Sequence, residues 1–243
     1  MPEFHPANAG GLRFDTNSRV SLWSPKLLAP ALWLDAADLT TITSLSGAVS
    51  QWNDKSGNGR HVTQATAANQ PTTGTVTQNG LNTISFDGSD DYMDSSAFTL
   101  SGQQWHLIVA VTGSARRTVQ VSNTAASTEA VVFQNPSSSP TYRWGLYRAN
   151  QAFTSTSTSS IANTAYLITA NFNASASYLR VNGTQVASGT AGSSNTNAVR
   201  LGANPAFAYT AGLLCEVVIV QGNLDSQQIA SWENWALAKW AVY

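Results

Sequence analysis

Residues 177–188 read SYLRVNGTQVAS and carry the clearest signal for the fold of this chain. Apolar and polar side chains alternate on both sides of Asn182 and Gly183. This period of two is typical of a strand with one buried face. An Asn-Gly pair favours the positive φ angles that a two-residue hairpin turn requires. The stretch therefore predicts a β-hairpin with its corner at Asn182 and Gly183.

Comparable short strands recur from residue 31 onward, separated by turn-forming sequences such as DKSGNG, FDGS and NPSSSP. They include ALWLDA, NTISF, WHLIVAVT, YRWGLYR, AYLITANF and LLCEVVIVQG. Many short strands divided by Gly, Asn and Pro turns are typical of an antiparallel sandwich or barrel. The pattern predicts an all-β domain.

One substantial helix is predicted at the C-terminal end, over residues 225–240. Asp225 is suited to cap its first turn, and Gln228 three residues later completes a capping-box pattern. Apolar residues then recur at steps of three and four, which places them in one stripe that faces the core. They are Ile229, Trp232, Ala236 and Trp240.

The composition excludes several classes of partner. Charged residues make up 10% of the chain and the formal net charge is −1, with Lys and Arg scattered, so no basic patch for nucleic acid is expected. The longest apolar run, LIVAV at 107–111, is too short to cross a bilayer, and no membrane insertion is expected. The first residues, MPEFHPANAGG, do not resemble a secretory signal. Cys215 is the only cysteine and is expected to be a small core residue.

Five stretches occur in an order that resembles a known family. They are LWLDAADLTTI…SGAVSQWNDKSGNGRHVTQ, ISFDGSDDYMD, YLRVNGTQVAS, VRLGANP and CEVVIVQGNLDSQQIASWENWALAKW. Together they resemble the laminin G-like branch of the concanavalin A-like lectin/glucanase jelly rolls. The resemblance implies a two-sheet antiparallel jelly-roll sandwich with one C-terminal helix, formed as one domain by residues 31–243. Similar modules are common in bacterial surface proteins and in phage tail or head appendages.

Residues 1–30 show no sustained period and are predicted to form an extended N-terminal arm. Four prolines keep this segment extended and remove backbone donors. Its large apolar side chains gain free energy when they are buried, so we expect the arm to be an assembly contact on a neighbouring subunit. Docking on its own domain is the alternative. The side chains are Phe4, Phe14, Leu22, Trp23, Leu27 and Leu28.

The catalytic motif of glucanases with this fold is absent. Such enzymes carry Glu-x-Asp-x-x-Glu on one strand, which places two carboxylates on one face. No glutamate here has an aspartate two residues later; the glutamates are Glu3, Glu129, Glu216 and Glu233. The histidines are far apart in sequence and form no zinc-binding pair. We therefore predict that the chain is not an enzyme.

The stretch ISFDGSDDYMD, at 84–94, holds four of the 13 acidic residues of the chain. In domains similar to this one, the Phe-Asp-Gly segment closes a strand and turns into the next. Asp-Gly and Ser-Asp are ordinary turn formers, so we expect chiefly a turn and no cofactor. Closely spaced carboxylates also suit Ca²⁺, and this alternative stays open. The candidate metal ligands are Asp87, Asp90 and Asp91.

The stretch TYRWGLYR, at 141–148, is the predicted carbohydrate site. If Trp144 and Leu146 face the core, then Arg143 and Tyr147 project together from the other face. An aromatic ring beside a guanidinium suits a sugar ring and its hydroxyls, whereas the alternative is a solvated surface strand. The predicted carbohydrate-binding residues are Arg143, Tyr147, Arg148 and Asn171.

These observations lead to one main hypothesis and two alternatives. The main hypothesis is a non-catalytic virion appendage subunit, from a phage tail, fibre or head decoration, that binds a cell-surface glycan for adhesion. The alternatives are a purely structural subunit without a ligand and a glycan-active enzyme with an unfamiliar site. The expected partners are a glycan and other virion or assembly subunits, bound through the arm in a homo-oligomer. The expected location is the phage particle, or otherwise the cell surface or the extracellular space.

Overall fold

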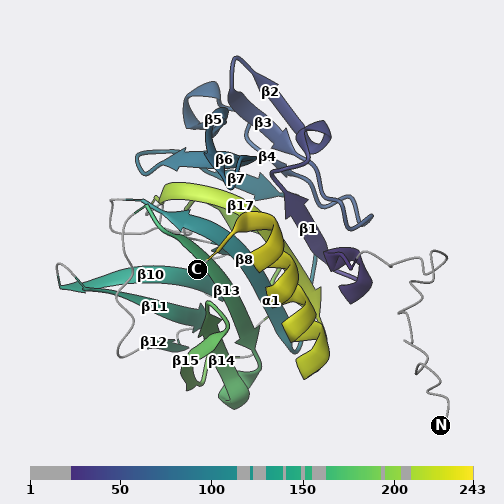
Figure 1. The fold of residues 1–243 in the computed structure, drawn as a ribbon, viewed down its shortest axis with the longest axis vertical. Helices are drawn as coiled ribbons and strands as arrows, with labels where there is room; N and C mark the ends of the chain where they lie inside the picture. The colour runs from purple at the N-terminus through teal and green to yellow at the C-terminus, as the bar shows by residue number, and fades with distance from the viewer. Residues whose placement is uncertain are drawn as a thin grey trace, which may run out of the picture.

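The chain forms two layers of antiparallel strands with a helix against one of them (Figure 1). The computed structural model describes residues 23–113, 121–122, 130–138, 141–148, 151–154, 163–192, 195–203 and 209–242. Within the strands between 121 and 154 it describes side chains only at 144–146. Every pairing of the described strands is antiparallel. The predicted all-β sandwich with one C-terminal helix is confirmed.

The strands up to the middle of the chain are β1 (Leu32–Asp35), β2 (Ile42–Leu45), β3 (Ala48–Trp52), β4 (Val62–Thr63), β5 (Thr72–Gln78), β6 (Leu81–Asp87), β7 (Met93–Ser95) and β8 (Gln104–Thr112). The later strands are β9 (Val121–Ser122), β10 (Ala130–Ser138), β11 (Thr141–Arg148), β12 (Gln151–Thr154), β13 (Ala165–Phe172), β14 (Ser177–Val181), β15 (Thr184–Gly189), β16 (Arg200–Leu201) and β17 (Ala211–Gln221). The helices are α1 (Ser226–Trp240) and the short 3₁₀ turns Pro25–Leu28, Leu39–Thr41, Ala67–Asn69 and Ala174–Ala176.

The first layer is built around β17, the longest described strand. One edge of β17 pairs with β8, and the sheet continues through β13 and β14 to β15. The other edge pairs with β6 near the start of β17 and with β1 near its end. The two ends of β17 therefore lie beside different parts of the molecule.

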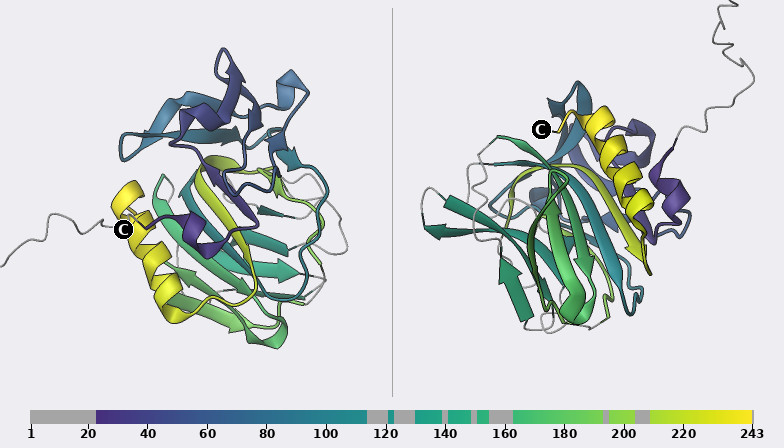
Figure 2. Two further views of the ribbon diagram at one scale, coloured as in Figure 1. Left: turned by 90° about the vertical axis from the view of Figure 1, so that its right-hand side faces the viewer. Right: turned by 60° about the horizontal axis from the view of Figure 1, so that its bottom comes forward.

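The second layer continues from β6 through β5 to β3, which also pairs with β2 and β4. From β4 it runs through β7, β16 and β9 to β10, β11 and β12. Figure 2 shows β10–β12 on the side of the first layer that is opposite to α1. The core lies between the two layers, where Trp144 of β11 packs on Tyr166 of β13 with ring centroids 5.2 Å apart.

Both faces of the central strands are covered. All residues of β8 are buried, because one face packs in the sandwich core and the other lies under α1. His106 is 1% exposed and contacts the ring of Phe172, and Cys215 is buried as predicted. Burial away from water raises the pKa of the Cys215 thiol.

The predicted local signals are confirmed at both ends of this layer. Asn182 and Gly183 have φ angles of 48° and 72°, which form the hairpin corner between β14 and β15. Asp225 accepts a hydrogen bond from the backbone N–H of Gln228, whose side chain accepts one from the N–H of Asp225. The predicted apolar stripe of α1 is buried. Among the described residues, no helix is long and apolar enough to cross a membrane.

The last part of the predicted arm packs on the domain. The indole of Trp23 lies 5.9 Å from that of Trp235 on α1, and Leu28 is 5% exposed. Leu27 is 60% exposed in the same 3₁₀ turn. Residues 1–22 lie outside the described residues, so the assembly role of the arm stays a prediction.

Candidate functional site

The aspartates of ISFDGSDDYMD lie in a turn at the end of β6. The Oδ1 atom of Asp87 accepts hydrogen bonds from the backbone N–H of Ser89 at 2.8 Å and of Asp90 at 3.3 Å. Gly88 has a φ of +83°, and a Cβ there would lie 2.8 Å from the Cβ of Ala211. Phe86 is buried just before the turn. The segment therefore forms the predicted turn through its own hydrogen bonds and a close approach to β17.

The same turn brings three carboxylates together. Asp87, Asp90 and Asp91 each place an oxygen within 4.8 Å of the others. Asp91 is 5% exposed, and its Oδ2 accepts a hydrogen bond from the N–H of Asp87 at 2.9 Å. Hard oxygens at such separations could serve a divalent cation, so these residues remain candidate metal ligands.

The carboxylates of this cluster differ in their pKa values. Burial raises the pKa of Asp91 to about 6, and the charges of Asp87 and Asp90 act in the same direction. For Asp87, burial acts upward, but hydrogen bonds from the backbone N–H groups of Ser89 and Asp90 hold its pKa below the ordinary value. Asp91 thus keeps its proton to a higher pH than the neighbouring Asp87 does.

An ion pair and an aromatic ring follow directly after the cluster. Asp94 of β7 is opposite Arg200 of β16 in the strand register. The guanidinium binds both carboxylate oxygens at 2.7 Å and lies 4.8 Å from the centroid of the Tyr92 ring. A Cβ on Gly202 would lie 2.3 Å from the Phe86 ring, so β16 and the turn are packed without spare space.

We call this surface the aspartate rim. Its members lie where β16 pairs with β7 and where β6 pairs with the start of β17. Figure 1 labels β6, β7 and β17 in this region. Planar ion pairs and aromatic rings are the groups with which proteins recognise sugar hydroxyls and sugar faces. The residues are Asp87, Asp90, Asp91, Tyr92, Asp94 and Arg200.

Of the four residues that were predicted to bind carbohydrate, three belong to β11 and one to β13. Arg143, Tyr147 and Arg148 belong to β11, but their side chains lie outside the described residues. Trp144 and Leu146 are buried, as predicted for the core face of that strand. The carbohydrate-binding role of Arg143, Tyr147 and Arg148 stays a prediction.

Asn171, the fourth predicted carbohydrate residue, lies in β13 and is 3% exposed. Its Oδ1 accepts a hydrogen bond from Gln103 Nε2 at 3.2 Å. Thr169, two residues earlier and hence on the same face, donates to Glu233 of α1. Asn171 therefore faces the α1 side of its sheet, whereas Trp144 of β11 contacts the opposite face through Tyr166.

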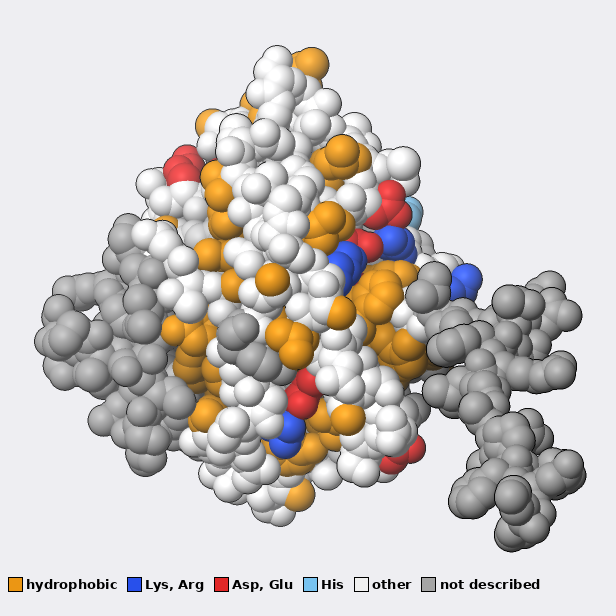
Figure 3. Space-filling view, in the orientation of Figure 1, with side chains coloured by type: hydrophobic (Ala, Val, Ile, Leu, Met, Phe, Trp, Pro, Cys, Tyr) orange, Lys and Arg blue, Asp and Glu red, His pale blue; other side chains and the backbone are white. Residues whose placement is uncertain are grey.

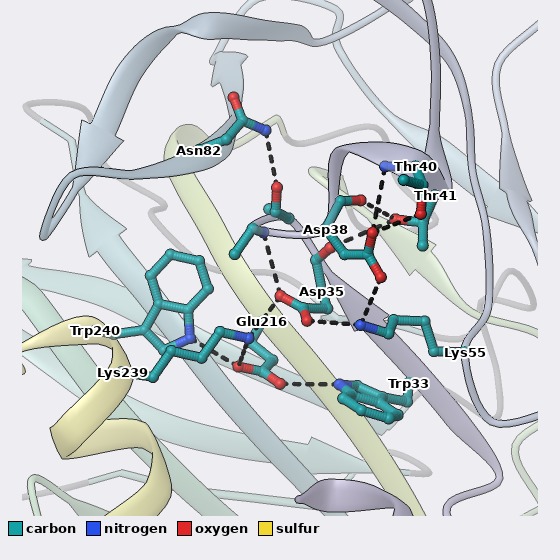
Figure 4. Close-up of polar contacts among 12 residues, drawn as sticks. Trp33, Asp35, Asp38, Thr40, Thr41, Lys55, Asn82, Glu216, Lys239 and Trp240 are labelled. Atoms are coloured by element: carbon teal, nitrogen blue, oxygen red, sulfur yellow. Dashed lines mark hydrogen bonds and ion pairs between the residues drawn. The ribbon is translucent and has the colours of Figure 1, made fainter.

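A second concentration of charge was not predicted from the sequence. Glu216 of β17 is fully buried, and Figure 4 shows donors at both of its oxygens. Trp33 Nε1 donates to Oε1 at 2.8 Å, while Trp240 Nε1 and Lys239 Nζ donate to Oε2 at 2.7 and 3.0 Å. Lys239 also contacts Asp35 Oδ1 at 2.6 Å.

We call this network the α1 clamp; it consists of Trp33, Asp35, Lys55, Glu216, Lys239 and Trp240. Burial raises the pKa of Glu216, and the nearby Asp35 carboxylate adds to this shift, whereas Lys239 and the two indoles oppose it. The clamp joins β1, β17 and α1. Its signal in the sequence is a glutamate inside the apolar strand LLCEVVIV, because a buried charge requires a partner.

Comparisons with known proteins agree on the fold. The family model Laminin G 3, described as the Concanavalin A-like lectin/glucanases superfamily, matches residues 79–230. No curated protein matches the sequence. Domain 4 of AbnA, a GH43 extracellular arabinanase from Geobacillus stearothermophilus solved in complex with arabinotriose, has a TM-score of 0.56 and 12% identity. That match covers 74% of this chain and 92% of the domain.

Two larger proteins contain a similar fold. An arabinofuranosidase complexed with arabinofuranosyl-alpha-1,2-xylobiose has a TM-score of 0.62 and 15% identity, over 84% of this chain and 58% of that protein. The sialidase of Trypanosoma rangeli in complex with the inhibitor DANA has a TM-score of 0.57 and 13% identity, over 83% of this chain and 32% of that one. This chain thus spans about a third to somewhat over half of these two proteins.

The prediction that the chain is not an enzyme is wrong. It rested on the missing Glu-x-Asp-x-x-Glu motif, but solved structures with a similar fold include an arabinanase domain, an arabinofuranosidase and a sialidase. One sheet architecture can hold different catalytic layouts, with carboxylates supplied by loops as well as by a single strand. The absence of one motif therefore does not exclude glycoside hydrolysis.

Proposed function

The chain belongs to the Concanavalin A-like lectin/glucanases superfamily, and from this premise we propose that it binds a carbohydrate at the aspartate rim. The observation that carries the proposal is the match itself, because residues 79–230 include the whole rim. Fold alone does not assign a ligand, so the rim must offer suitable chemistry.

The rim has the groups that sugar recognition needs. Arg200 holds Asp94 in a fixed bidentate geometry, with side chains 10% and 31% exposed, so part of this pair faces solvent. Tyr92 is half-buried and its ring lies against the guanidinium, and in this proposal the ring supplies the apolar surface for a sugar ring. Ionised carboxylates accept hydrogen bonds from sugar hydroxyls.

The arabinanase domain supports a carbohydrate as the ligand class. It was solved in complex with arabinotriose, and the match covers 92% of its length. Arabinotriose is therefore the first probe to test with this chain.

Isothermal titration with arabinotriose and a panel of neutral and acidic oligosaccharides tests the proposal. Tyr92→Ala and Asp94→Asn should each weaken binding about ten-fold, which corresponds to roughly 1.4 kcal/mol. Asp38→Asn is the matched control, because Asp38 is also paired with a cation and its side chain is also 31% exposed. If no sugar binds, or if Asp38→Asn weakens binding as much as Asp94→Asn, the rim is not the site.

A second candidate function is glycoside hydrolysis at the same rim. Asp91 has a pKa of about 6, whereas the pKa of Asp87 is lowered, and their carboxylate oxygens lie within 4.8 Å. Acid and base roles are assigned where the environment separates two pKa values, and retaining glycosidases place the carboxyl groups about 5–5.5 Å apart. Hydrolysis of arabinotriose that is lost in Asp91→Asn would support this function, because a sugar leaving group must be protonated as it departs. Equal hydrolysis by that variant would exclude Asp91 as the acid.

We also propose the setting in which binding occurs. A charge-poor chain with an apolar N-terminal segment fits a virion appendage subunit that adheres to a cell-surface glycan. In this proposal residues 1–22 contact other subunits of a homo-oligomer on the phage particle. A purely structural subunit is the alternative, and it predicts incorporation into a particle without any glycan binding.

A further inference from the structure

A group of uncharged polar side chains gathers at the other end of β17, where α1 begins (Figure 1). Gln103 lies just before β8, Asn171 near the end of β13, Tyr178 at the start of β14, and Asn223 between β17 and α1. Asn171 is directly opposite Tyr178 in the strand register, so both side chains share one face of the sheet. We call these four residues the amide patch.

Hydrogen bonds hold the amide patch together but leave part of its capacity unused. Gln103 Nε2 donates to Asn171 Oδ1 at 3.2 Å and to Asn223 Oδ1 at 3.4 Å. Among the described residues, the Nδ2 groups of Asn171 and Asn223 have no acceptor and Gln103 Oε1 has no donor. Asn171 is 3% exposed, and its amide nitrogen is not sealed from solvent.

Two aromatic residues, Tyr178 and Trp105, lie next to these amides. The ring of Tyr178 is partly exposed and meets the buried indole of Trp105 edge-on, with centroids 5.6 Å apart. Trp105 is itself fixed by its Nε1, which donates to the carbonyl of Gly222 at 3.0 Å. The Tyr178 ring therefore packs on an indole that is itself hydrogen-bonded to the backbone.

The patch contains no charged side chain. Beside the patch, Arg180 of β14 contacts both oxygens of Glu233 on α1 at 2.8 and 2.9 Å, and the Asp225 carboxylate accepts a hydrogen bond from the N–H of Gln228 at the start of α1. Figure 3 shows how sparse charged side chains are on the face that carries α1. The four patch residues offer no cation to pair with an anionic sugar. A neutral sugar needs only the hydrogen-bonding groups that they do offer.

We propose that the amide patch is a second carbohydrate subsite, specific for a neutral sugar with adjacent hydroxyls. Each hydroxyl is both donor and acceptor, so two neighbours can accept from Asn171 Nδ2 and donate to Gln103 Oε1. The ring of Tyr178 then packs on the sugar face. This inference rests on the proposed carbohydrate-binding function.

The amide patch and the aspartate rim are separate sites. The rim lies beside Ala211, where β17 begins, and the patch lies beyond Gln221, where β17 ends. An 11-residue strand is roughly 35 Å long. A short oligosaccharide therefore cannot occupy both, and the intact chain has two sites of different charge.

The test measures affinity and stoichiometry by calorimetry on the full chain, with neutral oligosaccharides that include arabinotriose and with 3′-sialyllactose as the acidic probe. The patch variant is Gln103→Ala combined with Asn223→Ala, which spares the buried Asn171. Gln221→Ala is the matched control, because this nearby glutamine donates to the Ser101 carbonyl at 3.1 Å instead. Asp94→Asn weakens binding at the aspartate rim.

The patch variant should bind the neutral sugar about ten-fold more weakly at one of two sites, because the sugar loses the acceptor Gln103 Oε1 and the nearby Nδ2 donor of Asn223. Gln221→Ala should bind like the unchanged protein, and Asp94→Asn should keep the patch site. If the patch variant keeps full affinity and stoichiometry while Asp94→Asn weakens all binding, the inference fails and the proposed function stands. If no neutral sugar binds the unchanged chain, the inference fails, and if no sugar of either kind binds, both fail. Stronger binding of sialyllactose at the patch would also overturn the inference.

Discussion

The α1 clamp and the aspartate rim hold much of the charge in a chain with few charged residues, and they use it in opposite ways. In the clamp, the buried Glu216 receives a donor at each oxygen, and Lys239 is shared with Asp35. In the rim, carboxylates face one another, and the buried Asp91 accepts a hydrogen bond from the N–H of Asp87 as its one donor among the described residues.

This difference distinguishes a structural charge from one that is available for binding. A buried charge whose hydrogen bonds are all satisfied has little left to offer a ligand and stabilises the packing around it. Carboxylates that repel each other are stabilised when a cation, a proton or a sugar hydroxyl approaches. The predictions below test this distinction, beginning with the clamp.

Breaking the clamp should give the largest loss of stability. Glu216→Ala leaves the Lys239 ammonium short of one partner and two indole N–H groups buried without an acceptor. Removing one member of a buried ionic network typically costs about 3–5 kcal/mol. Urea unfolding followed by tryptophan fluorescence measures this change in the free energy of unfolding.

A double variant separates loss of the network from loss of packing. Glu216→Leu combined with Lys239→Met replaces the charges with apolar groups and should recover much of the lost stability, since Asp35 keeps Lys55 at 2.9 Å. A single Glu216→Ala variant with a loss below 1 kcal/mol would show that the clamp is not structural.

A smaller loss is expected when the rim is forced open. Gly202→Ala places a Cβ 2.3 Å from the Phe86 ring at a φ of +81°, so both strain and overpacking should destabilise the protein by about 2–4 kcal/mol. Gly80→Ala is the control, because its φ is +73° and nothing lies within 4 Å of the added Cβ. Thermal unfolding of the two variants compares them. Equal losses would mean that contact with Phe86 contributes nothing.

The sequence predicted what depends on local patterns. The Asn182-Gly183 corner and the Asp225 capping box are formed by residues next to one another, so their residue types suffice. Asp35 and Lys239 are separated by 204 positions, and Asp94 and Arg200 by 106. These pairs depend on which strands become neighbours, and no local period records that.

The amide patch shows the same limit of prediction from the sequence. Asn171 was predicted as a carbohydrate residue through its expected closeness to β11, yet the described structure places its side chain beside Gln103. Alternation along β13 predicts the two faces of the strand, but not which of them lies under α1. That choice is made by packing between layers.

The pH dependence of stability should also distinguish the rim from the clamp. Its effect on the free energy of unfolding is smaller than the two effects above. The pKa of Asp91 rises from 3.8 to about 6 on folding. A raised pKa means that the folded state holds the proton more tightly, so this contribution is fully present below pH 3.8 and is lost as pH rises through 6. Asp91→Asn should therefore be more stable than the unchanged protein at pH 7.5 by roughly 1–2 kcal/mol.

The advantage of Asp91→Asn should shrink as pH is lowered from 7.5 to 4, and urea unfolding across this range measures it. Asp38→Asn is the control, because the pKa of Asp38 is lowered by its hydrogen bonds with Lys55 and Thr40. A lowered pKa stabilises the folded state above the unfolded value, so this variant should lose stability at pH 7.5 and approach the unchanged protein at low pH. An Asp91→Asn variant that is less stable at pH 7.5 would contradict the burial argument, and calcium that reverses its advantage would identify a metal site.

The smallest effect on stability is expected from deleting residues 1–22, which precede a contact next to the clamp. Trp23 packs on Trp235, whose ring lies 5.4 Å from the clamp residue Lys239. Deleting residues 1–22 keeps this contact and should change the free energy of unfolding by less than about 0.5 kcal/mol. Deleting residues 1–28 also removes Trp23 and the buried Leu28, and should cost about 2–5 kcal/mol.

The two deletions also separate the stability of the domain from the assembly proposed for the arm. Sedimentation velocity should find that the chain without residues 1–22 is a folded monomer, whereas the full chain forms an oligomer. A shorter deletion that unfolds the domain would mean that residues 1–22 complete the packing of α1, and one that still assembles would remove the arm from the assembly contact. Equal stability of the two deletions would instead show that the Trp23 contact does not support the clamp face of α1.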